Sequence, residues 1–394
     1  MGKTRGMTHR WTLLALAVLA PSLALASGKT TVAATPVIEQ AVTVAGTQQF
    51  DLTARGSGRT YRIFVALPDR PAPASGYGVL YVLDGNAMFL TATEAVRALG
   101  RRPDVPRDPA TVVVGIGYPD GVDVGVERTL DLTPPGIADA RIKAPSGGAD
   151  AFLEFIEQDL KPKIASLTSI DSARQGLFGH SFGGLFVLHS LATRPDAFTY
   201  RTAASASIWA TPSILDRLQS MAKSRGPDSP ALKVLLTAAE YEQSLSPFAR
   251  YQANADKVAQ SLSERGQVDK ARQAAQLLAQ GTGIRARFDE IAGEDHGTVI
   301  PAAISRAVWH QVVPLPVPAV PSAADYLAMT PQQRYDLRLH VRQLDDAQRI
   351  PWLSGLKQTL HDGLTKAQVE ALHSERNAMD SEQGTRPHAI NAPK

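Results

Sequence analysis

The stretch RQGLFGHSFGGLFV, residues 174–187, decides the fold. Its first half is apolar and predicts a buried strand, and the apolar run after Gly184 predicts a helix. Ser181 stands at the junction, with Gly179 two residues before it and Gly183 two residues after it. A serine on such a sharp strand-to-helix turn has the setting of a nucleophile elbow, in which the glycines prevent side-chain collisions. The alternative is a glycine-rich turn whose serine has no chemical role.

The segments around this turn predict alternating strands and helices. Two stretches that alternate apolar and polar residues, 43–54 and 59–68, predict an antiparallel pair with one face in water. Apolar and β-branched runs predict further strands at 77–85, 110–118, 174–181, 199–209, 232–240 and 283–291. Apolar residues at helical spacing predict helices at 86–99, 148–167, 182–195 and 298–313. The fold class is therefore α/β, with a mostly parallel central sheet and helices on both faces.

The N-terminus has the pattern of a secretory signal peptide over residues 1–26. Three basic residues precede the apolar run WTLLALAVLA, and Ala24-Leu25-Ala26 matches a cleavage signal. The alternative is a membrane anchor, but the apolar run is short for a spanning helix, which needs about 20 residues. We therefore expect cleavage near Ala26, a flexible leader over 27–40, no stable membrane insertion afterwards, and a periplasmic or secreted bacterial protein.

Charge and cysteine content exclude several kinds of function. The chain has no cysteine, which excludes disulfides, a cysteine nucleophile and thiolate metal sites. Three of the 41 basic residues lie in the predicted signal peptide, which has no acidic residue, so the rest of the chain carries 38 charges of each sign. This balance gives no reason to expect a nucleic-acid partner or a lipid surface.

The C-terminal part differs in composition from the predicted α/β domain, which we place at 41–313. A proline-rich linker is predicted over 314–329, a helical appendage over 330–379 and a disordered tail over 380–394. Thr330-Pro331-Gln332-Gln333 and Thr365-Lys366-Ala367-Gln368 have the pattern of helix caps. The apolar faces of these helices are expected at Leu337, Val341, Leu344, Leu353, Leu356, Leu360 and Leu364.

A serine nucleophile needs a histidine and, in most sites, an acid, which follow it in the order serine, acid, histidine. Of the nine histidines, His296 is the one in a loop between a late predicted strand and the last predicted helix of the domain. Glu240 and Glu242 follow the strand before that loop and are the candidates for the acid, with a Ser–His dyad as the alternative. Asp295 is a poor candidate, because neighbours in sequence rarely face each other.

Two backbone N–H groups are needed to stabilise an oxyanion. One is expected from Phe182, directly after the serine, and the other from the loop that follows the 77–85 strand. That loop points to Asn86, with Gly85 allowing close approach of the substrate.

Seven stretches in order resemble the esterase-D-like branch of the α/β-hydrolases, and within it a family of bacterial esterases that includes periplasmic trilactone siderophore esterases. The stretches cover residues 38–312 and are YVLDGNAMF, VGIGYPDG, RTLDLTP, FLEFIEQDLKPKI, GHSFGGLFVLHSL, ASASIWA and GEDHG. The resemblance implies that Ser181 is the nucleophile, His296 the base, Asn86 an oxyanion donor and Glu242 the acid, although the siderophore esterases use a dyad. It also implies that Tyr118, Arg128 and Trp209 line the substrate pocket. The appendage has no counterpart in the family's domain.

The sequence thus predicts a secreted serine esterase that acts on a small-molecule ester or a siderophore-type lactone. This chemistry needs no metal and no organic cofactor. An acyltransferase on the same scaffold and a binding protein without catalysis are the alternatives, and the intact serine, histidine and glycines oppose the second. Nothing in the sequence indicates an oligomeric state.

Overall fold

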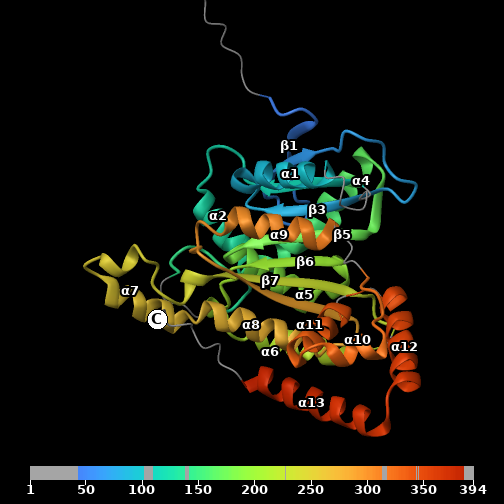
Figure 1. The fold of residues 1–394 in the computed structure, drawn as a ribbon. Helices are drawn as coiled ribbons and strands as arrows, with labels where there is room; N and C mark the ends of the chain where they lie inside the picture. The colour runs from blue at the N-terminus through green and yellow to red at the C-terminus, as the bar shows by residue number, and fades with distance from the viewer. Residues whose placement is uncertain are drawn as a thin grey trace, which may run out of the picture. The chain divides into compact units, whose positions relative to one another are not determined.

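A mixed sheet of eight strands forms the centre of the molecule (Figure 1). The computed structural model describes residues 43–101, 110–137, 142–226, 228–312, 317–342, 344 and 346–385. The predicted signal peptide and leader lie outside these residues. The strands are β1 (Thr47–Thr53), β2 (Thr60–Ala66), β3 (Tyr77–Leu83), β4 (Thr111–Gly117), β5 (Ile170–His180), β6 (Tyr200–Ala204), β7 (Leu232–Ala239) and β8 (Ile284–Ile291).

The strand order is β1-β2-β4-β3-β5-β6-β7-β8. The predicted antiparallel pair is present as β1 and β2, and β2 also pairs with β4 in antiparallel fashion. Every strand from β4 to β8 in this order runs parallel to its neighbour. The prediction of a mostly parallel sheet is therefore confirmed, and the carboxyl ends of β3, β5, β7 and β8 meet at one edge, where α/β sheets place their ligands.

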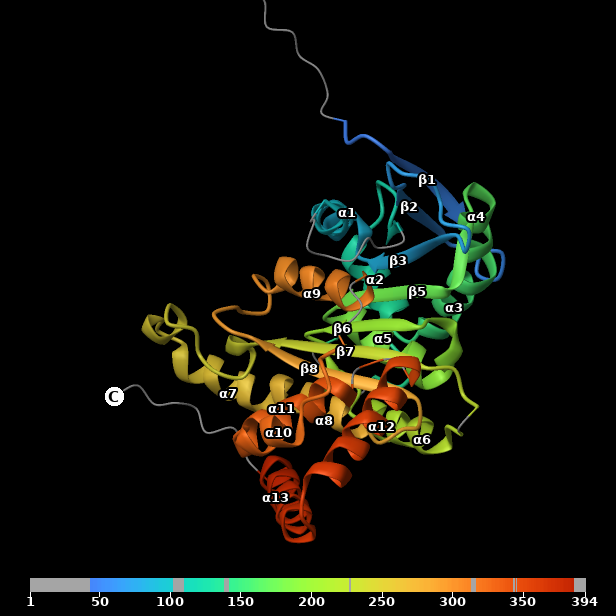
Figure 2. The same ribbon diagram turned by 45° about the vertical axis from the view of Figure 1, so that its right-hand side comes forward.

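Helices cover both faces of the sheet. Along β3, Val79 and Tyr81 belong to the core under one face, and Leu80 and Val82 to the core under the other. Figure 2 shows α1 and α9 on one face and α5, α6 and α8 on the other. The helices of this part are α1 (Gly85–Gly100), α2 (Val124–Leu132), α3 (Ala149–Phe155), α4 (Lys161–Leu167), α5 (Phe182–Thr193), α6 (Ile214–Ser224), α7 (Ala255–Arg265), α8 (Gln267–Leu278) and α9 (Ile300–Val312).

The helix predicted over 148–167 is interrupted. A π-helical turn, η1 (Ile156–Leu160), lies between α3 and α4. The apolar face is nevertheless fully buried, because a single wide turn rotates the helix without ending it. The buried residues are Phe152, Phe155, Ile156, Leu160 and Ile164.

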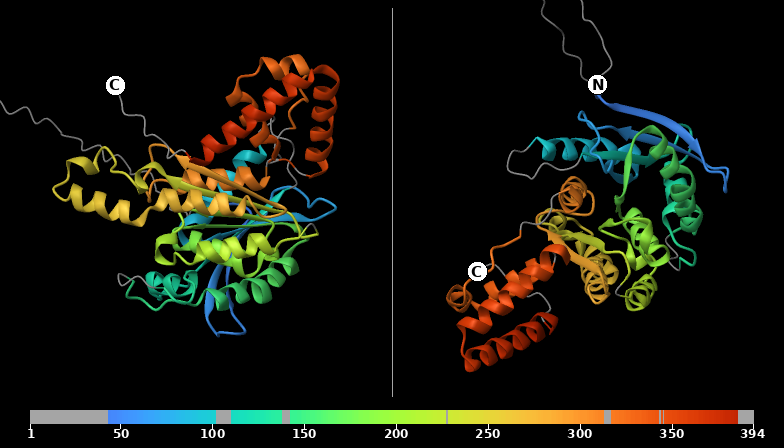
Figure 3. Two further views of the ribbon diagram at one scale, coloured as in Figure 1. Left: turned by 90° about the horizontal axis from the view of Figure 1, so that it is seen from below. Right: turned by 90° about the vertical axis from the view of Figure 1, so that its right-hand side faces the viewer.

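Four helices follow the sheet domain. They are α10 (Ala323–Ala328), α11 (Pro331–Arg342), α12 (Asp346–Gly363) and α13 (Lys366–Thr385), and both views of Figure 3 show them gathered together in orange and red. Both predicted caps are formed: Thr330 and Gln333 exchange hydrogen bonds, as do Thr365 and Gln368.

A small core of their own holds these helices together. Val341, Leu344 and Trp352 are buried, and Leu337 and Leu356 pack on them. Leu353, predicted for the apolar face, is instead 48% exposed, because the buried position is taken by the neighbouring Trp352. The indole Nε1 of Trp352 donates to the carbonyl of Pro318 at 2.7 Å.

Two element boundaries differ from the predictions for this region. The predicted linker contains α10, because the Ser322 hydroxyl caps the helix by accepting from the N–H of Asp325 at 3.1 Å. The helix α13 continues to Thr385, into the segment predicted to be disordered. The described residues from Ala45 onward form one compact unit by their contacts, so the domain boundaries at 313 and 330 stay predictions.

Within the described part of the chain, no helix combines the length and the apolarity needed to cross a membrane.

Candidate active site

Ser181 lies on a strained turn between β5 and α5. Its backbone angles are φ 61° and ψ −117°, which a residue with a side chain rarely adopts. A Cβ atom on Gly179 would lie 2.3 Å from the carbonyl oxygen of Gly183, so only glycine fits there. The predicted strand–turn–helix geometry around Ser181 is therefore present, and the hydroxyl stands at the start of a helix.

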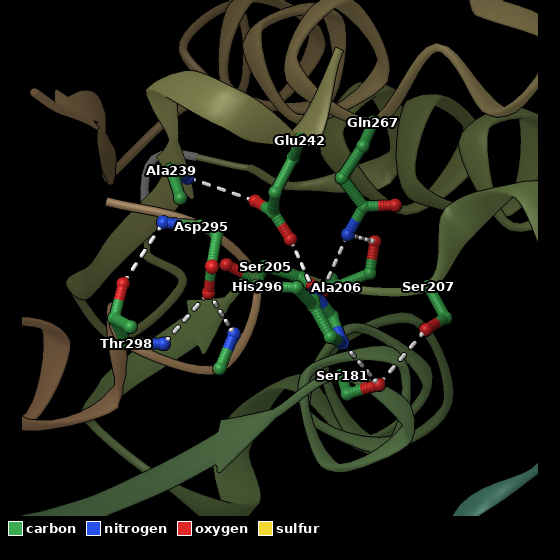
Figure 4. A network of polar contacts seen from close by, with 11 residues as sticks. Ser181, Ser205, Ala206, Ser207, Ala239, Glu242, Gln267, Asp295, His296 and Thr298 are labelled. Atoms are coloured by element: carbon green, nitrogen blue, oxygen red, sulfur yellow. Dashed lines mark hydrogen bonds and ion pairs between the residues drawn. The ribbon is translucent and has the colours of Figure 1, made fainter. Parts of the chain in front are cut away.

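His296 is brought to Ser181 by the loop between β8 and α9. Its Nε2 atom lies 3.1 Å from the Ser181 Oγ atom, and Figure 4 shows the imidazole between the serine and Glu242. Asp295, the residue before the histidine, bonds to its own turn. Its carboxylate accepts hydrogen bonds from the backbone N–H groups of Gly297 and Thr298, at 2.9 and 3.0 Å, and so fixes the loop that carries the histidine.

Glu242 is hydrogen-bonded to the other imidazole nitrogen, Nδ1 of His296. It lies in the short turn η4 (Glu240–Glu242) that follows β7, and its side chain is 2% exposed. Its second oxygen accepts from the N–H of Ala239 at 2.8 Å. Glu240, the other candidate, accepts from the N–H of Gly293 at 2.7 Å and therefore connects the two loops instead.

The segment after β6 supports the serine from the opposite side. The Ser207 hydroxyl lies 3.3 Å from the Ser181 Oγ atom. Ser205 has a positive φ of 47°, and the side-chain amide of the buried Gln267 donates to its carbonyl and, at 2.9 Å, to that of Ala206. Sequence reasoning did not single out Ser207 or Gln267, since a serine and a glutamine carry no signal until the strands are placed.

The two predicted oxyanion donors stand at helix starts. Phe182 is the first residue of α5 and Asn86 the second of α1, where N–H groups have no acceptor within the helix. The Asn86 side chain donates to the Tyr118 carbonyl at 2.9 Å and accepts from its N–H at 2.8 Å, which fixes the loop after β3. Both donor roles stay predictions.

Of the four residues predicted to contact the substrate, the structure places Trp209 in the pocket beside Ser181. Tyr118 is buried in the core next to Tyr61, and burial raises the pKa of its phenol. Gly85 is packed on β4, where a Cβ atom would lie 2.7 Å from the backbone of Gly115. The buried Tyr118 side chain therefore does not line this pocket, which corrects that expectation. The expected role of Gly85, which is to let the substrate approach the backbone closely, stays a prediction.

Arg128 lies outside the lining of that pocket, and its guanidinium forms a two-bond ion pair with Asp84. The distances are 2.8 and 2.9 Å. It also lies 5.8 Å from the centre of the Phe182 ring. The pair joins α2 to Asp84, the residue between β3 and α1. The contact of Arg128 with a substrate stays a prediction.

The pocket beside Ser181 has a volume of about 270 Å³. One wall carries the catalytic candidates, and the other comes from the region between β7 and α8, including α7. That second wall contributes Ser244, Ser246, Ala249, Val258, Leu262 and Arg265. This wall could not be predicted from the sequence, because its residues have no distinctive spacing.

His180, directly before the serine, is buried and not part of the hydrogen-bonded series. Its ring centre lies 4.6 Å from that of His296, and its Nε2 atom has no hydrogen-bond partner among the residues that the structure describes. Burial, reinforced by the nearby His296, lowers the pKa of His180 to about 4, so its imidazole is neutral at pH 7. Among the described residues, no cluster of histidine and carboxylate side chains is suited to hold a metal ion.

Comparisons with known proteins agree with this geometry. A family model described as "Putative esterase" matches residues 55–284. The ferri-bacillibactin esterase BesA of Bacillus subtilis is 40% identical over 276 residues, which cover 68% of this chain and 90% of that protein. The siderophore enterobactin esterase of Emericella nidulans is 35% identical over 275 residues, covering 63% of this chain and 88% of that protein.

Among solved structures, the siderophore hydrolase EstB from Aspergillus nidulans is similar with a TM-score of 0.63 and 29% identity. The match covers 71% of this chain and all of that one. The resemblance in sequence therefore extends to the fold, and this chain has the α/β-hydrolase fold.

Proposed function

Because the chain belongs to this esterase family, we propose that it is a serine esterase that cleaves carboxylic esters through an acyl-enzyme, with Ser181, His296 and Glu242 as its catalytic residues. The observation that carries the proposal is the continuous series of hydrogen bonds from the Ser181 hydroxyl through the His296 imidazole to the buried Glu242 carboxylate. Nucleophile, base and orienting acid have this arrangement in serine hydrolases on several unrelated folds.

In the proposed reaction, Ser181 Oγ attacks the ester carbonyl carbon as its proton passes to Nε2 of His296. Glu242 accepts from Nδ1–H, which fixes the tautomer and stabilises the imidazolium. The N–H groups of Phe182 and Asn86 donate to the oxyanion. The imidazolium then returns its proton to the leaving alcohol, and water repeats the sequence on the acyl-enzyme to release the acid.

The burial of Glu242 and the exposure of His296 suit these roles. Glu242 is 2% exposed, so its carboxylate can meet the imidazole without competition from water, while His296 is 50% exposed and can reach substrate and water. The Ala239 N–H on its second oxygen keeps the carboxylate turned toward the ring. These contacts favour a triad over a dyad.

For the substrate, we propose a small-molecule ester, with siderophore-type lactones as the first class to test. The support is the similarity to the two relatives above, both named as siderophore esterases. We also propose that the protein is exported, on the basis of the N-terminal pattern over residues 1–26.

The test is hydrolysis of a panel of aryl esters, siderophore lactones and esters from the cell envelope. We expect turnover of an aryl ester and faster turnover of at least one lactone, with Ser181→Ala as the blank. A purified, folded protein that cleaves no member of the panel, or one whose Ser181→Ala variant cleaves it equally well, would contradict the proposal.

A further inference from the structure

The pocket wall opposite the catalytic candidates carries an arginine that nothing in the proposed mechanism uses. Arg265 is the last residue of α7, is half-buried and lines the Ser181 pocket. Its guanidinium lies over the Trp209 ring, 5.0 Å from the ring centre. Within the part of the chain that the structure describes, its side chain has no hydrogen bond or ion pair, and its buried Nε atom has no acceptor.

The carboxylates that share the pocket already have partners. Glu242 accepts from His296 and Ala239, and Asp295 accepts from the N–H groups of Gly297 and Thr298. Backbone hydrogen bonds lower the pKa of Asp295, which keeps it charged and bound to its own turn. Arg265 is therefore a cation in a partly desolvated pocket without a counter-ion, which is costly unless a ligand supplies the negative charge.

The surroundings indicate where such a ligand would lie. Trp209 forms a flat apolar surface beneath the guanidinium, and Val258 and Leu262 on α7 add apolar wall. An acyl chain could follow this surface from Ser181, with its far end at Arg265. A planar guanidinium matches a carboxylate with two parallel hydrogen bonds, and an aromatic surface restricts the orientation of the guanidinium.

We propose that Arg265, supported by Trp209, binds a carboxylate of the substrate, so that the enzyme prefers esters with a free carboxylate remote from the scissile bond. This inference rests on the proposed function and names a substrate class for the same pocket. Arg265 would then be a specificity-determining residue, through which the enzyme distinguishes acidic esters from neutral esters of equal length.

A matched pair of substrates tests the proposal: the 4-nitrophenyl half-ester of adipic acid, with one free carboxylate, and its neutral methyl ester. We expect wild-type kcat/KM to be about 10-fold or more higher for the acidic ester at low ionic strength, and the ratio to fall as salt is added. Arg265→Gln should lower kcat/KM for the acidic ester about 10- to 100-fold and for the neutral ester less than threefold.

Three further variants complete the design. Arg265→Lys keeps the positive charge but lacks the two parallel N–H donors of the guanidinium. It should retain part of the preference for the acidic ester. Lys257→Gln, an exposed site on the same helix that does not line the Ser181 pocket, should leave both substrates unchanged. Arg265→Met keeps packing on Trp209 and replaces Arg265→Gln if that variant does not fold.

Equal wild-type kcat/KM for the two esters would overturn the inference and leave the proposed function standing, whatever the variants do. The same holds if the loss in Arg265→Gln is equal for both esters. If the wild type cleaves neither ester, the proposed function is overturned, and this inference with it.

Discussion

At the scale of single residues, the assignment of the acid depends on two glutamates only two positions apart. Glu242 is buried and bonded to His296, whereas Glu240 is bonded to the backbone of Gly293. Glu242→Gln should therefore lower kcat/KM on an aryl ester by about 10²–10³-fold, because the neutral amide stabilises the imidazolium poorly. Glu240→Gln keeps an oxygen acceptor for Gly293 and should cost less than threefold.

The two variants are compared on one substrate with the melting temperature measured in parallel. A larger loss in Glu240→Gln would show that the acid is misassigned. A loss of under threefold in both, which is less than about 1 kcal/mol of barrier, would mean that the site works as a Ser–His dyad.

The buried histidine before the nucleophile predicts a dependence of stability on pH. The pKa of His180 is lowered to about 4 by burial, against about 6.5 in an unfolded chain, so the unfolded state takes up the proton first as the pH falls. No stability is lost above pH 6.5, and the loss grows as the pH falls from 6.5 toward 4. At pH 5 the loss from His180 alone should be about 2 kcal/mol.

Urea unfolding at pH 7.5 and pH 5.0 checks this effect in the wild type and in His180→Leu. The variant should lose about 2 kcal/mol less than the wild type between the two pH values, while other histidines contribute equally to both proteins. An identical pH dependence in the two proteins would show that His180 does not titrate as its burial implies.

Chain order predicted the residues that the structure brings together, but it did not predict what each pocket wall contains. Ser181, Glu242 and His296 follow strands whose carboxyl ends share one edge of the sheet, and that rule needs no side-chain detail. Tyr118 was misjudged because its burial against Tyr61 depends on how distant segments pack. Arg265 could not be found, since its position follows from the fold of the whole wall between β7 and α8.

At the scale of elements, the turn at Ser181 requires the end of β5 and the start of α5 to lie in van der Waals contact with each other. A Cβ atom on Gly179 would meet the Gly183 carbonyl at 2.3 Å, and both groups are backbone and cannot move aside. Gly179→Ala should lower the free energy of unfolding by about 3 kcal/mol or more and abolish activity. Gly56→Ala is the control, because nothing lies within 4 Å of a Cβ atom there.

Denaturant unfolding and aryl-ester turnover of the two variants are measured side by side. A stable and active Gly179→Ala protein would contradict the geometry of the turn. Loss of stability in both variants would mean that the effect is not specific to the elbow.

Strands and most helices could be predicted because burial on one or two faces leaves a repeating pattern in the sequence. The antiparallel β1–β2 pair and the buried strands β3 and β4 follow from that pattern. The π-helical turn η1 could not be predicted, since an extra residue in a turn leaves the composition unchanged. The helix α10 was missed because the prolines at 314–321 predict an extended linker, and the single cap residue Ser322 was not recognised beside them.

At the scale of the whole molecule, the four last helices α10 to α13 have a core that, among the described residues, shares no member with the cores of the sheet domain. An ion pair between Arg334 and Glu375 joins α11 to α13 within the same group. Deleting residues 322–394 should therefore leave a folded protein whose aryl-ester kcat/KM is within about threefold of the full chain. An insoluble or inactive product would show that these helices stabilise the sheet domain or form part of the site.

The central claim is that Ser181 is the nucleophile, and labelling with a fluorophosphonate followed by peptide mass spectrometry tests it most directly. A serine activated by a histidine attacks the phosphorus and keeps the phosphonyl group as a stable adduct. We expect one adduct per chain, on the peptide that contains Ser181, at a rate strongly reduced in His296→Ala and with no labelling of Ser181→Ala. An adduct on another serine, or labelling that persists in Ser181→Ala, would contradict the account.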